Sequence, residues 1–154
     1  MTTEKKDIPN VIMLPPILIF FHVIAGITLD WAFPVNFGHA WGWLGLILLL
    51  SCFGIIAWAK KLFDRAGTPV PPNQPATAIV ITGPYYYSRN PMYVAFMVGY
   101  VGLSLLADAP AMLLLGFVLF YFLDQRVIAP EEKYLSEKFG TVYTDYKDEV
   151  RRWV

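Results

Sequence analysis

Residues 41–59 read WGWLGLILLLSCFGIIAWA, a run of 19 residues without Asp, Glu, Lys or Arg. A helix of this length rises about 28 Å, which nearly crosses a hydrocarbon core of about 30 Å. Residues 11–29 form a second uncharged run of the same length. With 56% hydrophobic residues and a mean hydropathy of +0.49, the chain has the composition of a membrane protein.

We therefore predict an all-α integral membrane protein whose 154 residues form a single membrane domain. Four transmembrane helices are expected, at about 11–30, 41–59, 91–107 and 110–128. The third and fourth apolar runs are short, and only Ala107-Asp108-Ala109-Pro110 separates them. The pair is predicted to form a hairpin whose ends reach into the membrane interface.

Basic residues indicate the orientation, because Lys and Arg accumulate in cytoplasmic loops. All twelve precede the first span, lie between the second and third, or follow the fourth: Lys5, Lys6, Lys60, Lys61, Arg65, Arg89, Arg126, Lys133, Lys138, Lys147, Arg151 and Arg152. Four spans with both termini cytoplasmic account for this distribution, whereas three or five do not. The first apolar run exceeds a signal-peptide core and is predicted to be a retained anchor.

Charge and cysteine content exclude several classes of function. A net charge of zero provides no field that would attract nucleic acid. The only cysteine, Cys52, can form neither an intramolecular disulfide nor a cysteine metal cluster by itself. We therefore predict no nucleic-acid partner and no metal site.

Two elements, 75–93 and 126–154, are predicted to lie at the cytoplasmic surface. The first belongs to a stretch rich in proline and glycine, which favours extended backbone. The second continues after Pro130 with apolar residues at helical spacing and charges between them. This pattern predicts one or two amphipathic helices lying against the membrane.

The motif SRNPMY, residues 88–93, combines several polar groups at the start of the third span. Asn90 is a good helix N-cap, and Pro91 suits the first helical position. Arg89 beside this positive helix end indicates an anion site. The alternative is that Arg89 only follows the positive-inside rule or reaches lipid phosphate.

Aromatic and acidic residues complete the candidate site. Tyr85, Tyr86, Tyr87 and Tyr93 offer rings for a heteroaromatic base or a cation, although an interfacial aromatic belt also predicts them. Arg126, Glu131 and Glu132 lie at the same cytoplasmic level. Carboxylates in a first helical turn need no ligand, but the two constellations together suit a ligand that carries both signs of charge.

From Pro75 onward the chain resembles the integral-membrane methyltransferases of the isoprenylcysteine carboxyl methyltransferase and phospholipid methyltransferase superfamily. The resemblance rests on TGPYYYSRNPMYVAF, residues 82–96, and EEKYLSEKFGTVYTDYKDEVRRW, residues 131–153. The family pattern has histidine where Asn90 stands and glycine where Ala95 stands. Prokaryotic members often carry Arg-Asn-Pro-Met-Tyr here, which implies a protein of a prokaryotic cytoplasmic membrane.

The resemblance implies that S-adenosylmethionine is the cofactor and that the motif residues bind it. Ile79, Val80, Gly83 and Tyr85 would line the adenosine side, and Asn90, Pro91, Met92 and Tyr93 the methionine side. Arg89 would fix either the motif or the cofactor carboxylate, Glu131 and Glu132 would accept hydrogen bonds from the cofactor, and Arg126 would lie near the methyl acceptor. In catalysis the resemblance thus gives roles to Arg126, Glu131 and Glu132.

A lipidic or prenylated methyl acceptor is expected, because an interfacial site receives a substrate laterally from the membrane lipids. O-methylation of a carboxylate is favoured, since a carboxylate needs no base whereas an ammonium must lose a proton. His22, within the first span, is expected to form an interhelical hydrogen bond. Three alternatives stay open: a phospholipid N-methyltransferase, an NADPH-dependent sterol-type membrane reductase and a non-enzymatic membrane scaffold.

Overall fold

The computed structural model describes residues 7–154, except for the side chain of His39. Lys5 and Lys6, two of the basic residues used to orient the chain, lie outside this range. The described chain forms helices and loops, which confirms the all-α prediction. The helices are α1 (Pro15–Ala32), η1 (His39–Trp41), α2 (Gly42–Ala66), η2 (Gly83–Tyr86), α3 (Pro91–Leu106), α4 (Pro110–Phe122), the π-helical η3 (Leu123–Ile128), α5 (Ala129–Phe139) and α6 (Thr141–Glu149).

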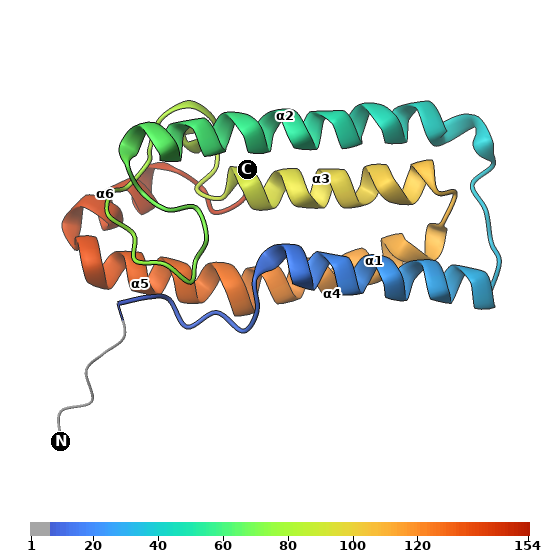
Figure 1. Cartoon of the computed structure of the whole chain (residues 1–154), viewed down its shortest axis with the longest axis horizontal. Coiled ribbons are helices and arrows are strands. Elements are labelled where there is room, and N and C mark those ends of the chain that lie inside the picture. The colour runs from blue at the N-terminus through green and yellow to red at the C-terminus, as the bar shows by residue number, and fades with distance from the viewer. Residues whose placement is uncertain (1–6) are drawn as a thin grey trace, which may run out of the picture.

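Four helices run side by side along the long axis, α2 packed on α3 and α1 on α4 (Figure 1). α5, α6 and the segment 67–90 gather at one end of this bundle. Small residues allow α2 and α3 to approach closely: a Cβ atom at Gly45 would stand 2.5 Å from the carbonyl oxygen of Gly102. The bundle therefore carries its polar elements at a single end.

Three helices have the length and composition to cross a membrane: Pro15–Ala32, Gly42–Ala66 and the continuous Pro110–Phe139. The shorter apolar helix, α3, has 16 residues and rises about 24 Å. Large apolar side chains such as Phe20, Phe53 and Phe117 are exposed on the bundle. Helices long and apolar enough to cross a membrane are thus found at three of the four predicted spans, the first, second and fourth, while the third span, at α3, and the orientation stay predictions.

Several boundaries differ from those expected. α1 begins at Pro15 rather than near residue 11, because a proline in the first turn loses no helical hydrogen bond. α2 continues to Ala66, seven residues beyond the predicted end at 59, and stops at Gly67 with φ +65°. The helix thus continues beyond its apolar part into a segment that carries Lys60, Lys61 and Arg65.

The fourth predicted span is continuous with the first amphipathic helix, through the π-helical segment η3. Pro130 has no N–H group and would leave the carbonyl of Arg126 without a partner in a regular helix. In the structure the N–H of Ile12 donates to that carbonyl at 3.4 Å, while Ala129 bonds back to Asp124. The π-helical turn accommodates the proline without ending the helix.

Two amphipathic helices follow, in agreement with the prediction. Gly140, with φ +56°, separates α5 from α6. The buried faces of Tyr143, Tyr146 and Val150 pack against Ile79, Leu135 and Phe139. This small core holds the extended segment before η2 against the carboxyl-terminal helices.

Candidate cofactor site at the polar end of the bundle

A cavity with about 830 Å³ of empty space, part of it open to solvent, lies among the segment 69–80, the start of α3, and α5 and α6. This size suits a small organic ligand. Most of the predicted cofactor residues line it: Ile79, Val80, Tyr85, Arg89, Asn90, Met92, Tyr93, Glu131 and Glu132. The structure thus brings together groups that are separated by up to 53 positions in the sequence, from residue 79 to 132.

Three of the predicted residues do not line this cavity. Gly83 has φ +65°, and a Cβ atom there would stand 2.8 Å from Leu62, so it allows η2 to pack on α2. Pro91 is buried as the first residue of α3. Arg126 is exposed within η3.

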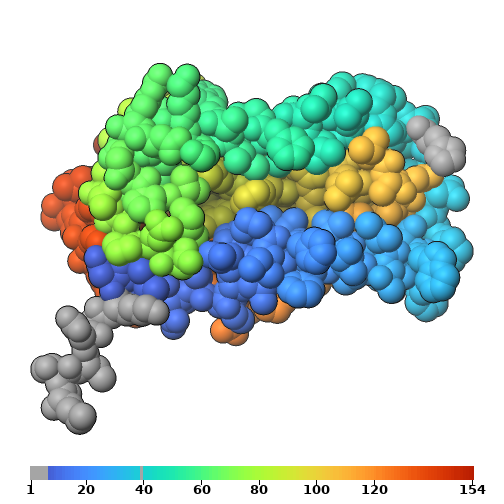
Figure 2. Space-filling model, in the orientation of Figure 1, coloured from blue at the N-terminus to red at the C-terminus, as the bar shows by residue number. Residues whose placement is uncertain are grey.

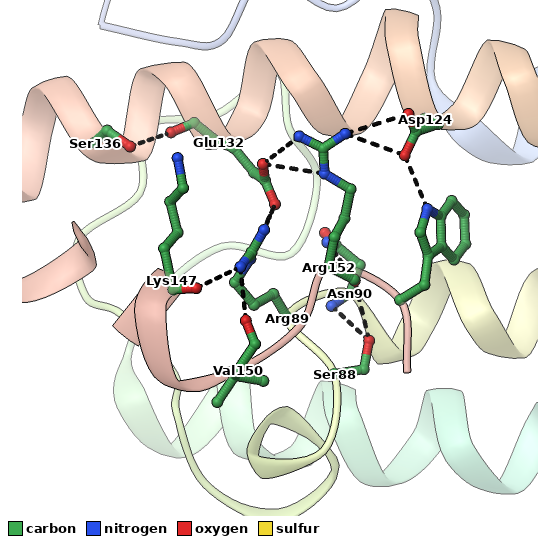
Figure 3. A network of polar contacts seen from close by, with 10 residues as sticks. Ser88, Arg89, Asn90, Asp124, Glu132, Ser136, Lys147, Val150 and Arg152 are labelled. Atoms are coloured by element: carbon green, nitrogen blue, oxygen red, sulfur yellow. Dashed lines mark hydrogen bonds and ion pairs between the residues drawn. The ribbon is translucent and has the colours of Figure 1, made fainter. Parts of the chain in front are cut away.

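Glu132 is buried at the centre of an ion-pair network (Figure 3). Arg89 donates to its Oε1 from Nε at 3.0 Å and from Nη2 at 2.8 Å. Arg152 donates to Oε2 from Nη2 at 2.7 Å and from Nε at 3.2 Å. Two guanidinium groups therefore compensate one carboxylate in a position where an unpaired charge would be strongly unfavourable.

Arg89 also binds the carboxyl-terminal segment. Its Nη1 donates to the carbonyls of Lys147 at 2.8 Å and Val150 at 2.6 Å. The side chain is 9% exposed, so the alternative in which it reaches lipid phosphate is wrong. Its contacts in the structure fix the motif, the first of the two roles that the resemblance implied.

Asn90 occupies the N-cap position of α3, but the prediction that its side chain caps the helix is wrong. Its Nδ2 donates instead to the carbonyl of Arg152 at 3.0 Å. The hydroxyl of Ser88 donates to the same carbonyl at 3.2 Å and accepts the N–H of Asn90 at 3.1 Å. The side-chain amide of Asn90 therefore binds the segment after α6 instead of capping α3.

Residues 150–153 form a strap across the motif, which the sequence analysis missed. Arg152 donates to Asp124 at 3.2 Å (Figure 3). The indole N–H of Trp153 donates to the same carboxylate at 2.8 Å. Trp153 also stacks on Phe120, with ring centroids 4.6 Å apart. In the sequence analysis Arg152 served only to indicate the orientation of the chain. Its local pattern gives no sign of its partners Glu132 and Asp124, which lie 20 and 28 residues away.

Glu131 has surroundings very different from those of its neighbour. It lies beyond the apolar part of its helix, and the hydroxyl of Tyr93 donates to its Oε1 at 2.6 Å. Burial raises the pKa of Glu131 to about 7, an effect that the Tyr93 hydrogen bond opposes and the charge of Glu132 reinforces. Glu131 therefore titrates near neutral pH.

Tyr85 lines the cavity and has an unpaired, buried hydroxyl. The side chain is 5% exposed, and the hydroxyl has no hydrogen-bond partner within the described chain. Burial raises the pKa of Tyr85, so the group remains a neutral donor. Buried polar groups are nearly always paired, so this hydroxyl is a donor without a partner beside the cavity.

The four tyrosines of the motif separate into two groups. Tyr85 and Tyr93 line the cavity, as the stacking prediction requires. Tyr86 and Tyr87 are 71% and 72% exposed and contact each other edge to face. For this exposed pair, the interfacial belt is the better explanation.

Sequence reasoning missed part of the cavity wall. Tyr143 and Tyr146 line it from α6, and the hydroxyl of Tyr146 donates to the carbonyl of Tyr85 at 2.6 Å. Tyr134 lines it from α5 and accepts the N–H of Ala76 at 3.1 Å. The tyrosine-rich spacing of the carboxyl-terminal region was the signal that could have assigned them to the site.

A second, apolar cavity adjoins the first. It has about 560 Å³ of empty space, part of it open, and lies between the start of α1, the segment 70–72 and the start of α3. Val70, Pro72, Met92 and Tyr93 line both cavities. Figure 2 shows α3 recessed between α2 and α1 on this face, with the segment 67–80 resting against the start of α1.

Comparison with known proteins assigns this arrangement. The phospholipid methyltransferase family model matches residues 40–142, from η1 into α6. The chain belongs to this family. The resemblance of the motif regions is thereby confirmed, and the chain is a member of a family of membrane methyltransferases that use S-adenosylmethionine.

Individual relatives match a shorter region. Protein-S-isoprenylcysteine O-methyltransferase of Saccharomyces cerevisiae is 42% identical over 73 residues, which are 47% of this chain and 30% of the yeast protein. The enzyme of the same name from Schizosaccharomyces pombe is 40% identical, with the same coverage. Nickel-cobalt-cadmium resistance protein NccN of Alcaligenes xylosoxydans xylosoxydans is 38% identical over 80 residues, 50% of this chain and 34% of that protein. The matched region therefore spans about a third of these relatives.

Proposed function

We propose that this phospholipid methyltransferase family member transfers a methyl group from S-adenosylmethionine to a lipidic acceptor at the cytoplasmic face of the membrane. The observation that carries the proposal is a cavity lined by Glu131, Glu132 and Tyr85, the last of which has a hydroxyl without a hydrogen-bond partner in the described chain. Donor, acceptor and anionic groups together fit a cofactor that has a nucleoside, an amino acid portion and a sulfonium charge.

Different residues of the cavity would contact different parts of this cofactor. Tyr85 would donate a hydrogen bond, and the rings of Tyr85 and Tyr93 would contact its adenine or its cationic centre. Glu131 would complement its positive charge, while Glu132, paired with Arg89 and Arg152, would hold the cavity wall in place. Arg126, which the resemblance places near the methyl acceptor, would have to turn toward the site from its exposed position.

The bound cofactor supplies an electrophilic methyl group, and the protein contributes position and exclusion of water. Methyl transfer needs the nucleophile in line with the reacting carbon, so holding the acceptor is worth much of the rate enhancement. Tyr93 and Met92 line both cavities and would hold the junction where the two substrates meet.

The apolar cavity supports a lipidic acceptor. Its walls are proline, leucine, valine, methionine and aromatic side chains, and it opens beside α1 and α3. In the proposed topology, four spans with both termini cytoplasmic, this opening lies at the inner membrane surface. An acceptor would enter from the bilayer while the cofactor enters from the cytoplasm.

Two acceptor chemistries are considered. O-methylation of a lipid carboxylate is the chemistry that the sequence favoured and that the names of the yeast relatives describe. The charges favour the other chemistry, N-methylation of an amine, because Arg89 is the one cationic residue lining the cavity among residues 7–154 and four bonds from its guanidinium go to Glu132 and to the carbonyls of Lys147 and Val150. A carboxylate acceptor would meet Glu131 without a counter-charge.

Calorimetric titration of the detergent-purified protein with S-adenosylhomocysteine, with NADPH in parallel, tests the proposal. We expect binding of S-adenosylhomocysteine alone, and weaker binding by the Glu132→Gln variant. Asp64→Asn, which alters an exposed helical ion pair with Lys60, serves as the matched control and should bind normally. Binding of NADPH alone, or of neither ligand by folded protein, would refute the proposed function.

A further inference from the structure

Arg152 does not line the polar cavity, but it bonds to two residues that do. Its side chain donates to Oε2 of Glu132, on α5, from Nη2 at 2.7 Å and from Nε at 3.2 Å. Its backbone carbonyl accepts hydrogen bonds from Nδ2 of Asn90 at 3.0 Å and from the hydroxyl of Ser88 at 3.2 Å. Glu132 and Asn90 both line the cavity. A single residue of the strap thus links α5 to the start of α3.

The guanidinium group of Arg152 is itself held by a second carboxylate. Its Nη1 donates to both oxygens of Asp124, on η3, at 3.2 Å (Figure 3). Asp124 also accepts the indole N–H of Trp153, whose ring stacks on Phe120 of α4. The planar guanidinium matches this task, because its forked donors can bond two carboxylates in fixed directions. Arg152 is therefore fixed to η3 while it holds Glu132.

Removal of the Arg152 side chain would affect Glu132 more than the bundle. Glu132 would lose two of its four hydrogen bonds from guanidinium groups and keep the two from Arg89, which go to Oε1. The buried ion pair between Arg89 and Glu132 would remain. Arg152 is thus suited to fix the placement of Glu132 rather than to keep the helices folded.

We propose that Arg152 is a positioning residue of the cofactor site, which holds Glu132 and the start of α3 in place so that the cavity is preformed when the cofactor binds. The inference rests on the proposed function and deepens it. Arg152 acts through two contacts, its guanidinium on Glu132 and its carbonyl on Asn90, and touches the cofactor with neither.

Pre-organisation is the reason that a residue outside the cavity affects the affinity. Asn90, Met92 and Tyr93 line the cavity from the start of α3, and the carbonyl of Arg152 holds the first of them. If the strap is not anchored, the cofactor has to order this wall as it binds, and the free energy of ordering weakens the affinity. With the strap anchored, the wall is ordered before binding.

Calorimetric titration of the detergent-purified full chain with S-adenosylhomocysteine tests the inference. We expect Arg152→Ala to bind it about tenfold more weakly than the wild type, a usual size for the coupling between two parts of a protein. Arg151→Ala is the matched control, because it removes the same charge from an exposed neighbour. It keeps the backbone carbonyl that accepts the N–H of Arg89 at 2.9 Å and should bind as the wild type does.

A second readout separates positioning from a purely structural role. Reaction of the buried Cys52 thiol with a dye shows the temperature range in which each variant is folded, and titrations are made within it. Ethylguanidinium added to folded Arg152→Ala should restore part of the affinity, since the Arg152 side chain is 32% exposed and its place is open to a small cation. Ethylammonium should restore less, because a point charge lacks the forked donors. Neither cation should change binding by the wild type.

Each contrary result has a defined meaning. If S-adenosylhomocysteine binds the wild type and Arg152→Ala equally well, the inference is wrong and the proposed function stands. The same conclusion follows if ethylguanidinium restores no more affinity than ethylammonium, or if Arg151→Ala loses as much affinity as Arg152→Ala. If S-adenosylhomocysteine does not bind to the folded wild type, the proposed function and this inference fail together.

Discussion

Replacing Glu132 by alanine should destabilise the protein, because the replacement leaves a buried arginine without its anion. Arg89 is 9% exposed, and its Nε and Nη2 atoms would lose both of their bonds to Oε1. Removing one partner of a buried ion pair costs about 3 to 5 kcal/mol. Arg152 is 32% exposed and keeps Asp124, so its share is small, about 0 to 1 kcal/mol.

The buried thiol of Cys52 provides the assay. It lies 6% exposed in the α2–α3 interface and is the only cysteine in the chain, so its reaction with a thiol-specific dye reports opening of the bundle. Heating detergent-purified protein with the dye gives a midpoint temperature. With a few degrees per kcal/mol for a chain of this size, Glu132→Ala should lower the midpoint by roughly 10 °C.

Two comparisons decide whether the reasoning is correct. Asp64→Ala removes the exposed pair with Lys60, whose side chains are 61% and 59% exposed, and should change the midpoint little. The double variant Glu132→Ala and Arg89→Met should be more stable than Glu132→Ala alone, since it removes the uncompensated charge. A double variant as unstable as the sum of the two single changes would refute the argument.

Further predictions concern other parts of the molecule. Tyr85→Phe should leave the free protein at least as stable, because the hydroxyl is unpaired, yet weaken S-adenosylhomocysteine about fivefold in calorimetry; unchanged affinity would remove this hydroxyl from the site. Gly102→Ala should lower the thermal midpoint, since the new Cβ would stand 2.8 Å from an α2 carbonyl, whereas Gly54→Ala, which meets nothing within 4 Å, should raise it slightly; equal effects would contradict the packing argument. A reporter inserted in the loop 33–38 should be found outside the cytoplasm, and a cytoplasmic signal would exclude the proposed orientation. Because the folded pKa of Glu131, about 7, exceeds its ordinary value of 4.5, the unfolding free energy of the wild type should fall as the pH rises from 4.5 to 7; denaturation of Glu131→Gln should lack this component, and a slope identical to that of the wild type would show that Glu131 does not cause it.

Much of the architecture could be predicted from local pattern. Long uncharged runs predict apolar helices because each backbone group must bond within its own segment when water is absent. Pro15, Pro91 and Pro110 mark helix starts, because a proline in the first turn needs no N–H partner. The SRNPMY motif followed by the pair Glu131-Glu132 also indicated the family, which the match over residues 40–142 then established.

Local pattern failed where the outcome depended on competition between distant partners. By sequence alone Pro130 starts a new helix, but the structure keeps one helix and uses a π-helical turn, because Ile12 satisfies the carbonyl that proline leaves free. Asn90 has the composition of a cap, but a carbonyl 62 residues away takes its amide. Hydrogen bonds between residues so far apart leave no periodic pattern in the sequence.

The sequence by itself determined that this protein is a membrane-embedded helical methyltransferase-family chain with polar elements at the start of α3 and after α4, since hydrophobicity and proline act locally. Tertiary structure alone decided that Glu132 is paired with Arg89 and Arg152 while Glu131 faces Tyr93. The two glutamates are identical in chemistry and adjacent in the chain. Only the packing of α3, α5 and the strap around them gives one carboxylate its cations and the other its pKa of about 7.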